Sequence, residues 1–202
     1  MKQAVCYNVR IVELIYLEDN MVKDKKMVNK LCISAMFIAI GWLVPFLSGQ
    51  NTALGNMLCF MHIPVIVAGF VLGPGYGAII GAVTPITRFM IFGMPPIYPI
   101  GVCMAVELTG YGFLSGFLFR LLKQRSKFQE IVIIYISLIG AMLGGRLLWG
   151  AARVLCGVFS NTAFTWKLFM TGAFVTAWPG ILIQIFLIPA IIIGLNRSKI
   201  MK

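Results

Sequence analysis

Charged residues are scarce in this chain. Only 11% of its 202 residues are Asp, Glu, Lys or Arg, whereas 60% are hydrophobic, and the mean hydropathy is +0.94. So little charge cannot cover the surface of a soluble globule of this size, and the composition predicts a polytopic membrane protein. The net charge of +11 does not indicate nucleic-acid binding, because most basic residues flank apolar segments, as membrane topology requires.

Residues that build metal sites and disulfide frameworks are also few. The chain has one histidine, His62, and an odd number of cysteines without C-x-x-C spacing. This pattern argues against a metal site, a metal cofactor or a disulfide framework, and we expect small buried thiols instead. The cysteines are Cys6, Cys32, Cys59, Cys103 and Cys156.

The motifs that an enzyme of this size would need are missing. No G-x-x-x-x-G-K-[ST] loop is present, so the chain cannot hydrolyse ATP by that route. One histidine and one acidic residue within the apolar segments cannot assemble a Ser/His/Asp, Cys/His or paired-carboxylate site. We therefore expect no catalytic activity and no cofactor. Nor are inverted halves evident of the kind that larger secondary transporters show.

Six apolar segments are long enough to cross a bilayer, and Gly/Pro turns separate several of them. They predict an all-α integral membrane protein with six transmembrane helices in one domain, residues 23–198. We expect residues 1–22 to be an N-terminal extension, either disordered or over-annotated, and 199–202 a cytoplasmic tail. The segments run over 29–48, 54–73, 76–93, 97–121, 130–155 and 166–195.

The distribution of basic residues predicts the orientation of these helices. Lysine and arginine gather before the first segment, between the fourth and fifth, and after the sixth, whereas the connections 48–56 and 157–165 contain neither. By the positive-inside rule, both termini are cytoplasmic. The residues concerned are Lys23, Lys25, Lys26, Lys30, Arg120, Lys123, Arg125, Lys127, Arg197, Lys199 and Lys202.

Four charged residues lie inside the apolar segments: Arg88, Glu107, Arg146 and Arg153. Such charges are costly in hydrocarbon and usually face a protein interior or a ligand cavity. The predicted topology places all four in the outer half of the membrane, with Glu107 about 15 Å below the outer start of its segment. Three cations against one anion predict a pocket for an anionic ligand. Alternatively, Glu107 pairs with Arg88 or Arg146 only to hold the bundle, and Arg153 extends toward the interface.

Uncharged side chains complete the predicted substrate site. Trp149 shares one helix face with Arg146 and Arg153, where it could stack on a ligand. Asn51 and Tyr98 lie in connections on the outer side, and could line or cover the pocket. The alternative for these two is an ordinary solvated connection.

Small residues indicate close packing and a docking face. The pairs Gly77/Gly81, Gly112/Gly116 and Gly140/Gly144 allow helices to approach closely. Ala35 and Ala39 give the first segment a flat face near its cytoplasmic end, where another membrane protein could dock.

Several separated stretches carry a resemblance to a known family. Over about residues 21–197, the sequence resembles the substrate-binding S components of energy-coupling factor (ECF) transporters. The stretches are Ile33–Ala39, Gly69–Gly77, Phe92–Pro96 with Met104–Gly112, Gly145–Gly150 and Gly172–Gly180.

The resemblance implies capture of a vitamin or related micronutrient at a prokaryotic cell membrane. Ala35 and Ala39 match the A-x-x-x-A pattern with which such proteins contact a transmembrane coupling subunit, which works with two cytoplasmic ATPases. The ligand would be released inside after docking on that module. The M-P-P and G-R-x-x-W-G stretches look like the branch of proposed pantothenate transporters, while riboflavin, folate or a cobalamin-type ligand stay open. Other functions that stay open are a self-sufficient small carrier or channel and a ligand-sensing membrane subunit.

Overall fold

The computed structural model describes residues 2–45, 57–93, 96–125, 129–159 and 165–197. The chain divides into two units, residues 1–36 and 37–202. The first is part of the helix α1 (Lys2–Leu43), which continues into the second unit. Within the first unit, the Ser34 hydroxyl donates to the Lys30 carbonyl at 2.8 Å, one turn earlier. Helix α1 begins at Lys2, so it includes residues 2–22 of the predicted extension, and the predicted domain boundary stays a prediction.

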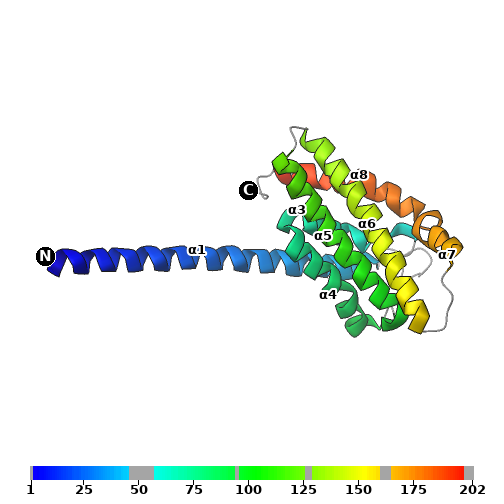
Figure 1. The fold of residues 1–202 in the computed structure, drawn as a ribbon, viewed down its shortest axis with the longest axis horizontal. Coiled ribbons are helices and arrows are strands. Elements are labelled where there is room, and N and C mark those ends of the chain that lie inside the picture. The colour runs from blue at the N-terminus through cyan, green and yellow to red at the C-terminus, as the bar shows by residue number, and fades with distance from the viewer. Residues whose placement is uncertain (1, 46–56, 94–95, 126–128, 160–164, 198–202) are drawn as a thin grey trace. The chain divides into compact units, whose positions relative to one another are not determined.

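The described residues of the second unit form helices joined by short turns (Figure 1). Two short segments, η2 and η3, contain wide helical turns, and η2 is interrupted at Tyr98, whose backbone is extended with φ −120° and ψ 135°. The remaining elements are α3 (His62–Leu72), α4 (Pro74–Phe92), η2 (Ile97–Gly101), α5 (Val102–Arg125), α6 (Glu130–Phe159), α7 (Trp166–Met170), η3 (Thr171–Val175) and α8 (Trp178–Arg197).

Among the described residues, five helical segments are long and apolar enough to cross a membrane, and α3 is a shorter apolar helix. This confirms an all-helical chain with several candidate spans, while the count of six and the orientation of the termini stay predictions. The five are Val22–Leu43, Pro74–Phe92, Ile97–Arg125, Glu130–Val158 and Trp178–Arg197.

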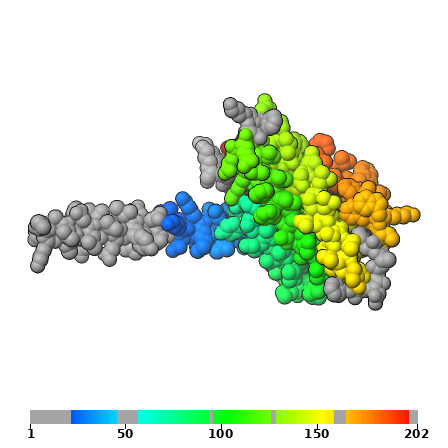
Figure 2. Space-filling model, viewed as in Figure 1, coloured from blue at the N-terminus to red at the C-terminus, as the bar shows by residue number. Residues whose placement is uncertain are grey.

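Helix α5 is central to the second unit, where it packs against α3, α4 and α6. The surfaces of α5 and α6 adjoin along their length (Figure 2). Glycine makes the α4–α5 contact possible: a Cβ at Gly77 would lie 2.3 Å from the Gly112 carbonyl oxygen, and one at Gly81 would lie 2.3 Å from that of Leu108. The predicted role of small residues in close helix packing is confirmed for these two helices.

The turn between α3 and α4 depends on one glycine and one arginine. Gly73 has φ 96°, which favours a residue without a side chain. Arg120 of α5 lies against this turn and donates to the Leu72 carbonyl at 3.1 Å. It thereby satisfies an acceptor that the end of α3 leaves without a helical partner.

Two predicted spans differ from the structure. The second was predicted over 54–73, but α3 begins at His62, because Cys59 has φ 48° and interrupts helical geometry. The sixth was predicted over 166–195, but it is divided into α7, η3 and α8. Helix α8 begins at Trp178, so that Pro179 lies in its first turn, where a missing amide hydrogen costs no helical bond.

Candidate functional site

Glu107 and Arg146 form a buried ion pair between α5 and α6. The Arg146 guanidinium donates to Glu107 Oε1 at 3.0 Å, and their side chains are only 8% and 4% exposed. The sequence left open whether Glu107 pairs with Arg88 or with Arg146, and the structure shows Arg146. Since a buried charge is stable only with a well-placed partner, each residue holds the other in place.

Two further side chains meet the same carboxylate oxygen. Tyr111, one turn along α5, donates its hydroxyl to Glu107 Oε1 at 3.1 Å. His62 Nε2 lies 3.5 Å from this oxygen, and the His62 ring meets the Tyr111 ring edge-on at 5.1 Å. The site therefore joins α3, α5 and α6 around one acceptor.

Cys59 connects this group to the last helix. Its carbonyl accepts a hydrogen bond from Gln184 Nε2 of α8 at 3.3 Å and lies 3.1 Å from His62 Nδ1, while its Sγ accepts from Arg146 at 3.6 Å. The same carbonyl accepts a hydrogen bond from the backbone N–H of His62 at 3.0 Å, so one acceptor joins the start of α3 to Gln184. We name Cys59, His62, Glu107, Tyr111, Arg146 and Gln184 the polar core.

Arg88 differs from Arg146 in having no acidic partner among the residues described. Its Nη1 makes one long contact with the Met61 sulfur at 3.9 Å, and within the described ranges its buried Nε has no hydrogen-bond partner. Met61 precedes His62 in the chain, so Arg88 borders the polar core. A partly buried guanidinium with unused donors is suited to bind an anion.

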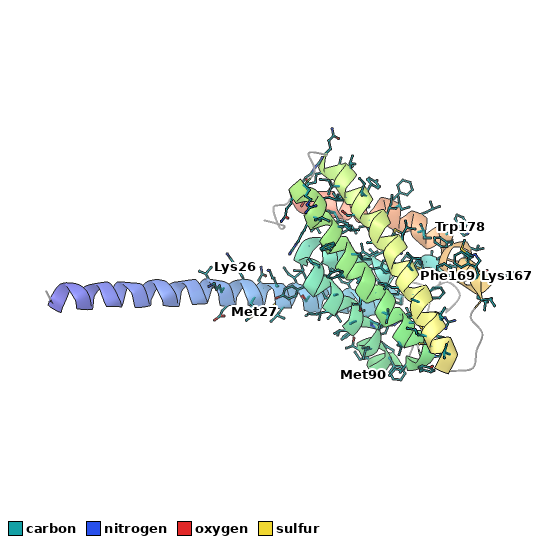
Figure 3. The ribbon with its side chains drawn as sticks, viewed as in Figure 1. Lys26, Met27, Met90, Lys167, Phe169 and Trp178 are labelled. Atoms are coloured by element: carbon teal, nitrogen blue, oxygen red, sulfur yellow. The ribbon has the colours of Figure 1, made fainter. Side chains whose placement is uncertain are left out.

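Arg153 and Trp149 lie together, as their spacing on one helix face predicts. The Arg153 guanidinium carbon is 5.8 Å from the centre of the Trp149 ring, within the range of a cation–π contact. The centre of the Trp149 ring also lies 6.2 Å from that of Phe169, and the Phe169 ring centre lies 5.2 Å from that of Trp166. Figure 3 shows Phe169 near Lys167 and Trp178, where α7 and the start of α8 gather aromatic side chains.

The remaining predicted residues are placed in different surroundings. Tyr98 is exposed, and its hydroxyl donates to the Cys156 carbonyl at 2.9 Å. Asn51 lies outside the described residues. Ala35 is exposed in the first unit and Ala39 is partly buried in the second. No group of three metal-ligating side chains occurs in the part of the chain that the structure describes.

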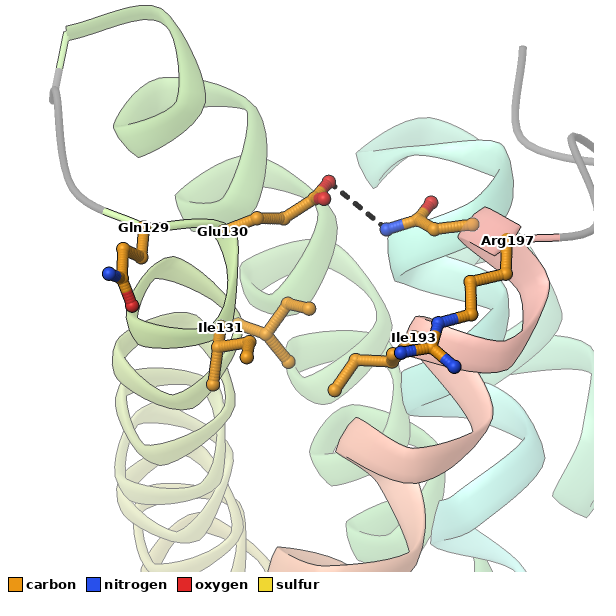
Figure 4. Close-up of a pocket in the computed structure, with 7 residues that line it drawn as sticks. Gln129, Glu130, Ile131, Ile193 and Arg197 are labelled. Carbon is orange, nitrogen blue, oxygen red and sulfur yellow. Dashed lines mark hydrogen bonds between the residues drawn. The ribbon is translucent and has the colours of Figure 1, made fainter.

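A surface pocket of about 460 Å³ lies elsewhere, between the start of α6 and the end of α8 (Figure 4). Glu130, at its rim, accepts hydrogen bonds from Lys123 at 3.1 Å and from Asn196 at 3.0 Å. None of the predicted substrate residues lines it. Its lining residues are Gln129, Glu130, Ile131, Ile134, Ile193, Asn196 and Arg197.

Several members of the polar core are not among the substrate residues that the sequence predicts. His62 contacts the Cys59 carbonyl, and no pattern in the sequence connects either residue to Glu107. Tyr111 could have been found from its i, i+4 spacing to Glu107. Gln184 is an uncharged polar residue within the most apolar candidate span, and that was the available signal.

Arg88 and the polar core together bring charged and hydrogen-bonding groups close to one another. Arg88 offers donors to an anion, and the polar core offers a carboxylate, a hydroxyl and an amide nearby. Such a combination of donors and acceptors can bind a small polar ligand.

Comparison with known families agrees with this conclusion. The chain matches the family model described as ECF transporter, substrate-specific component, over residues 29–192. Comparisons with curated proteins and with solved structures found no match. The family match extends from α1 to α8 and includes every residue of the polar core. The chain therefore belongs to the substrate-specific components of ECF transporters.

Proposed function

We propose that this transport subunit captures a small, water-soluble anionic micronutrient, and that Arg88 supplies the positive charge that binds it. Members of the family bind substrates for transport and are not enzymes. The observation that carries the proposal is the contrast between two arginines. Arg146 is neutralised by Glu107, whereas the hydrogen-bond partner of Arg88 among the residues described is the Met61 sulfur. An anionic ligand would remove the cost of leaving Arg88 without a counter-charge.

Pantothenate is the favoured ligand within this class. Its carboxylate suits bidentate binding to a guanidinium, and its hydroxyl and amide groups need both donors and acceptors. Glu107, Tyr111 and Gln184 carry groups of these kinds. Trp149 and Arg153 would then form an adjoining wall, with Asn51 and Tyr98 contributing from the connections. The pocket would lie in the outer half of the membrane.

Transport would require partners, since the chain lacks a phosphate-binding loop. Ala35 and Ala39 would contact a transmembrane coupling subunit, and two cytoplasmic ATPases would drive release of the ligand inside the cell. The exposure of Ala35 leaves room for such a contact. A bulky Ala35→Trp change should stop uptake and assembly while leaving ligand binding intact. Uptake that persists without the ATPases would instead indicate a self-sufficient carrier.

The test of the ligand class is mass spectrometry of small molecules released when the detergent-purified full chain is denatured. We expect one anionic vitamin per chain from the unaltered protein and none from Arg88→Gln. Lys123→Gln is the matched control, because it also removes one positive charge but from an exposed ion pair with Glu130. A neutral ligand, or an anionic one retained by Arg88→Gln, would overturn the proposed role of Arg88.

A further inference from the structure

Two thiols meet where α5 begins and α6 ends. Cys103 Sγ and Cys156 Sγ lie 3.6 Å apart, although 53 positions separate these residues in the chain. Both are reduced, and the residues are buried, with exposures of 0% and 9%. A contact this close between two distant cysteines has no role in the substrate site described above.

Packing holds this pair in place from three sides. Ala152 joins Cys103 and Cys156 in one buried cluster, and Trp149 packs against that cluster. The Tyr98 hydroxyl, from η2, donates to the Cys156 carbonyl at 2.9 Å. The thiols are therefore positioned by helices and by a side chain that lies over the end of α6, rather than brought together by chance motion.

The pair adjoins the candidate substrate residues. Cys103 is four residues before Glu107 and lies on the same face of α5. Cys156 follows Arg153 by three residues and Trp149 by seven, on one face of α6. A covalent bond here would connect the two helices that carry the Glu107–Arg146 ion pair.

We propose that Cys103 and Cys156 form a reversible dithiol–disulfide site that, when oxidised, fastens the start of α5 to the end of α6. A disulfide needs a sulfur–sulfur distance of about 2.05 Å, so the two Sγ atoms must approach by only about 1.5 Å. The reaction needs a two-electron oxidant small enough to enter the buried cluster, such as a peroxide or a diazene.

The step balances with a diazene oxidant. One cysteine sulfur, after losing its proton, adds to the N=N bond and forms an S–N bond. The second sulfur, also deprotonated, attacks the first, and the S–N bond breaks as the S–S bond forms. Both thiol protons end on nitrogen, so the diazene is reduced to a hydrazine while the two thiols are oxidised to one disulfide.

The other cysteines with described side chains are poor competitors for this reaction. The Cys59 sulfur accepts a hydrogen bond from Arg146 within the polar core. Cys32 is exposed on α1 and is suited to link two chains rather than to react within one. These differences predict a specific intramolecular product.

The experiment treats the full chain in detergent with diamide, blocks the remaining thiols with an alkylating agent under denaturing conditions, and maps the peptides by mass spectrometry. We expect two alkylatable thiols per chain to be lost, a peptide linking Cys103 to Cys156 to appear, and both changes to reverse with dithiothreitol. Cys32→Ser should retain this result, whereas Cys103→Ala and Cys156→Ala should each abolish the linked peptide.

The mapping on the unaltered chain decides the matter even if an alanine variant folds poorly. Alkylation of both Cys103 and Cys156 after oxidation would overturn the proposal. So would linkage of either residue to another cysteine or to a second chain. The readout does not depend on any substrate, so its failure would leave the proposed transport function unaffected.

Discussion

Two carboxylates in this protein each accept a hydrogen bond from a basic side chain at almost the same distance. One of these ion pairs is buried and the other is exposed. Arg146 Nη1 lies 3.0 Å from Glu107 Oε1, and Lys123 Nζ lies 3.1 Å from Glu130 Oε1. The first pair has side-chain exposures of 8% and 4%, the second of 58% and 48%. The geometry of an ion pair therefore says little about its importance, and its surroundings say much more.

The two surroundings have different physical consequences. In the buried pair, removing one partner leaves a charge in a medium that solvates it poorly, which typically costs about 3–5 kcal/mol. In the exposed pair, water and salt replace the lost partner, and the loss is about 0–1 kcal/mol. The proposed substrate site contains the buried pair, whereas the surface pocket lined by Glu130 contains the exposed pair.

The largest expected effect is that of Glu107→Gln. The substitution keeps the shape of the side chain but leaves Arg146 as a buried charge without an anion, so we expect the free energy of unfolding to fall by about 3–5 kcal/mol. Thermal unfolding in detergent or chemical unfolding would measure it. The double variant Glu107→Met/Arg146→Met should recover much of the loss, because it removes both charges together. No recovery would mean that shape, rather than charge, dominates at this position.

The next effect concerns Arg88 and distinguishes binding from stability. Arg88 has no acidic partner among the residues described, so Arg88→Gln should leave the unfolding temperature unchanged or raise it slightly. Loss of charged hydrogen bonds to an anion, at about 1.5–3 kcal/mol, should weaken ligand affinity by roughly 10- to 100-fold. Calorimetric titration with pantothenate would measure this loss. An unchanged affinity together with a large loss of stability would assign Arg88 to the scaffold instead.

Tyr111→Phe should have a smaller effect that sharpens the account of the buried pair. The variant removes one hydrogen bond to Glu107 Oε1 but leaves the Arg146 contact, so we expect a loss of about 1.5 kcal/mol in unfolding free energy. The Tyr111 ring should remain packed edge-on against His62, since it does not depend on the hydroxyl. Additivity with Glu107→Gln would contradict a shared network, because the two groups act on the same oxygen.

The sequence predicted these features unequally. It placed the third, fourth and fifth helical segments to within a few residues and identified the charges within them, because hydropathy and charge are properties of single positions along the chain. It could not choose between Arg88 and Arg146 as the partner of Glu107, since that choice depends on the rotation of each helix about its axis. The Gln184–Cys59 contact joins residues 125 positions apart, and no local pattern reports such a distance. Likewise, the interruption at Cys59 comes from a backbone angle that cysteine rarely adopts, and composition gave no sign of it.

The smallest expected effect is that of Glu130→Gln, which tests the exposed ion pair of the comparison. Glu130 accepts from Lys123 and Asn196, but its side chain is half exposed, so water can replace both contacts. We expect the unfolding free energy to change by less than about 1 kcal/mol, and less at high salt than at low salt, because exposed charges are screened. Unfolding measured at two salt concentrations, with Glu107→Gln in parallel, would show it. A loss as large as that of Glu107→Gln would mean that burial does not separate the two pairs, and the reasoning that assigns the binding charge to Arg88 would lose its basis.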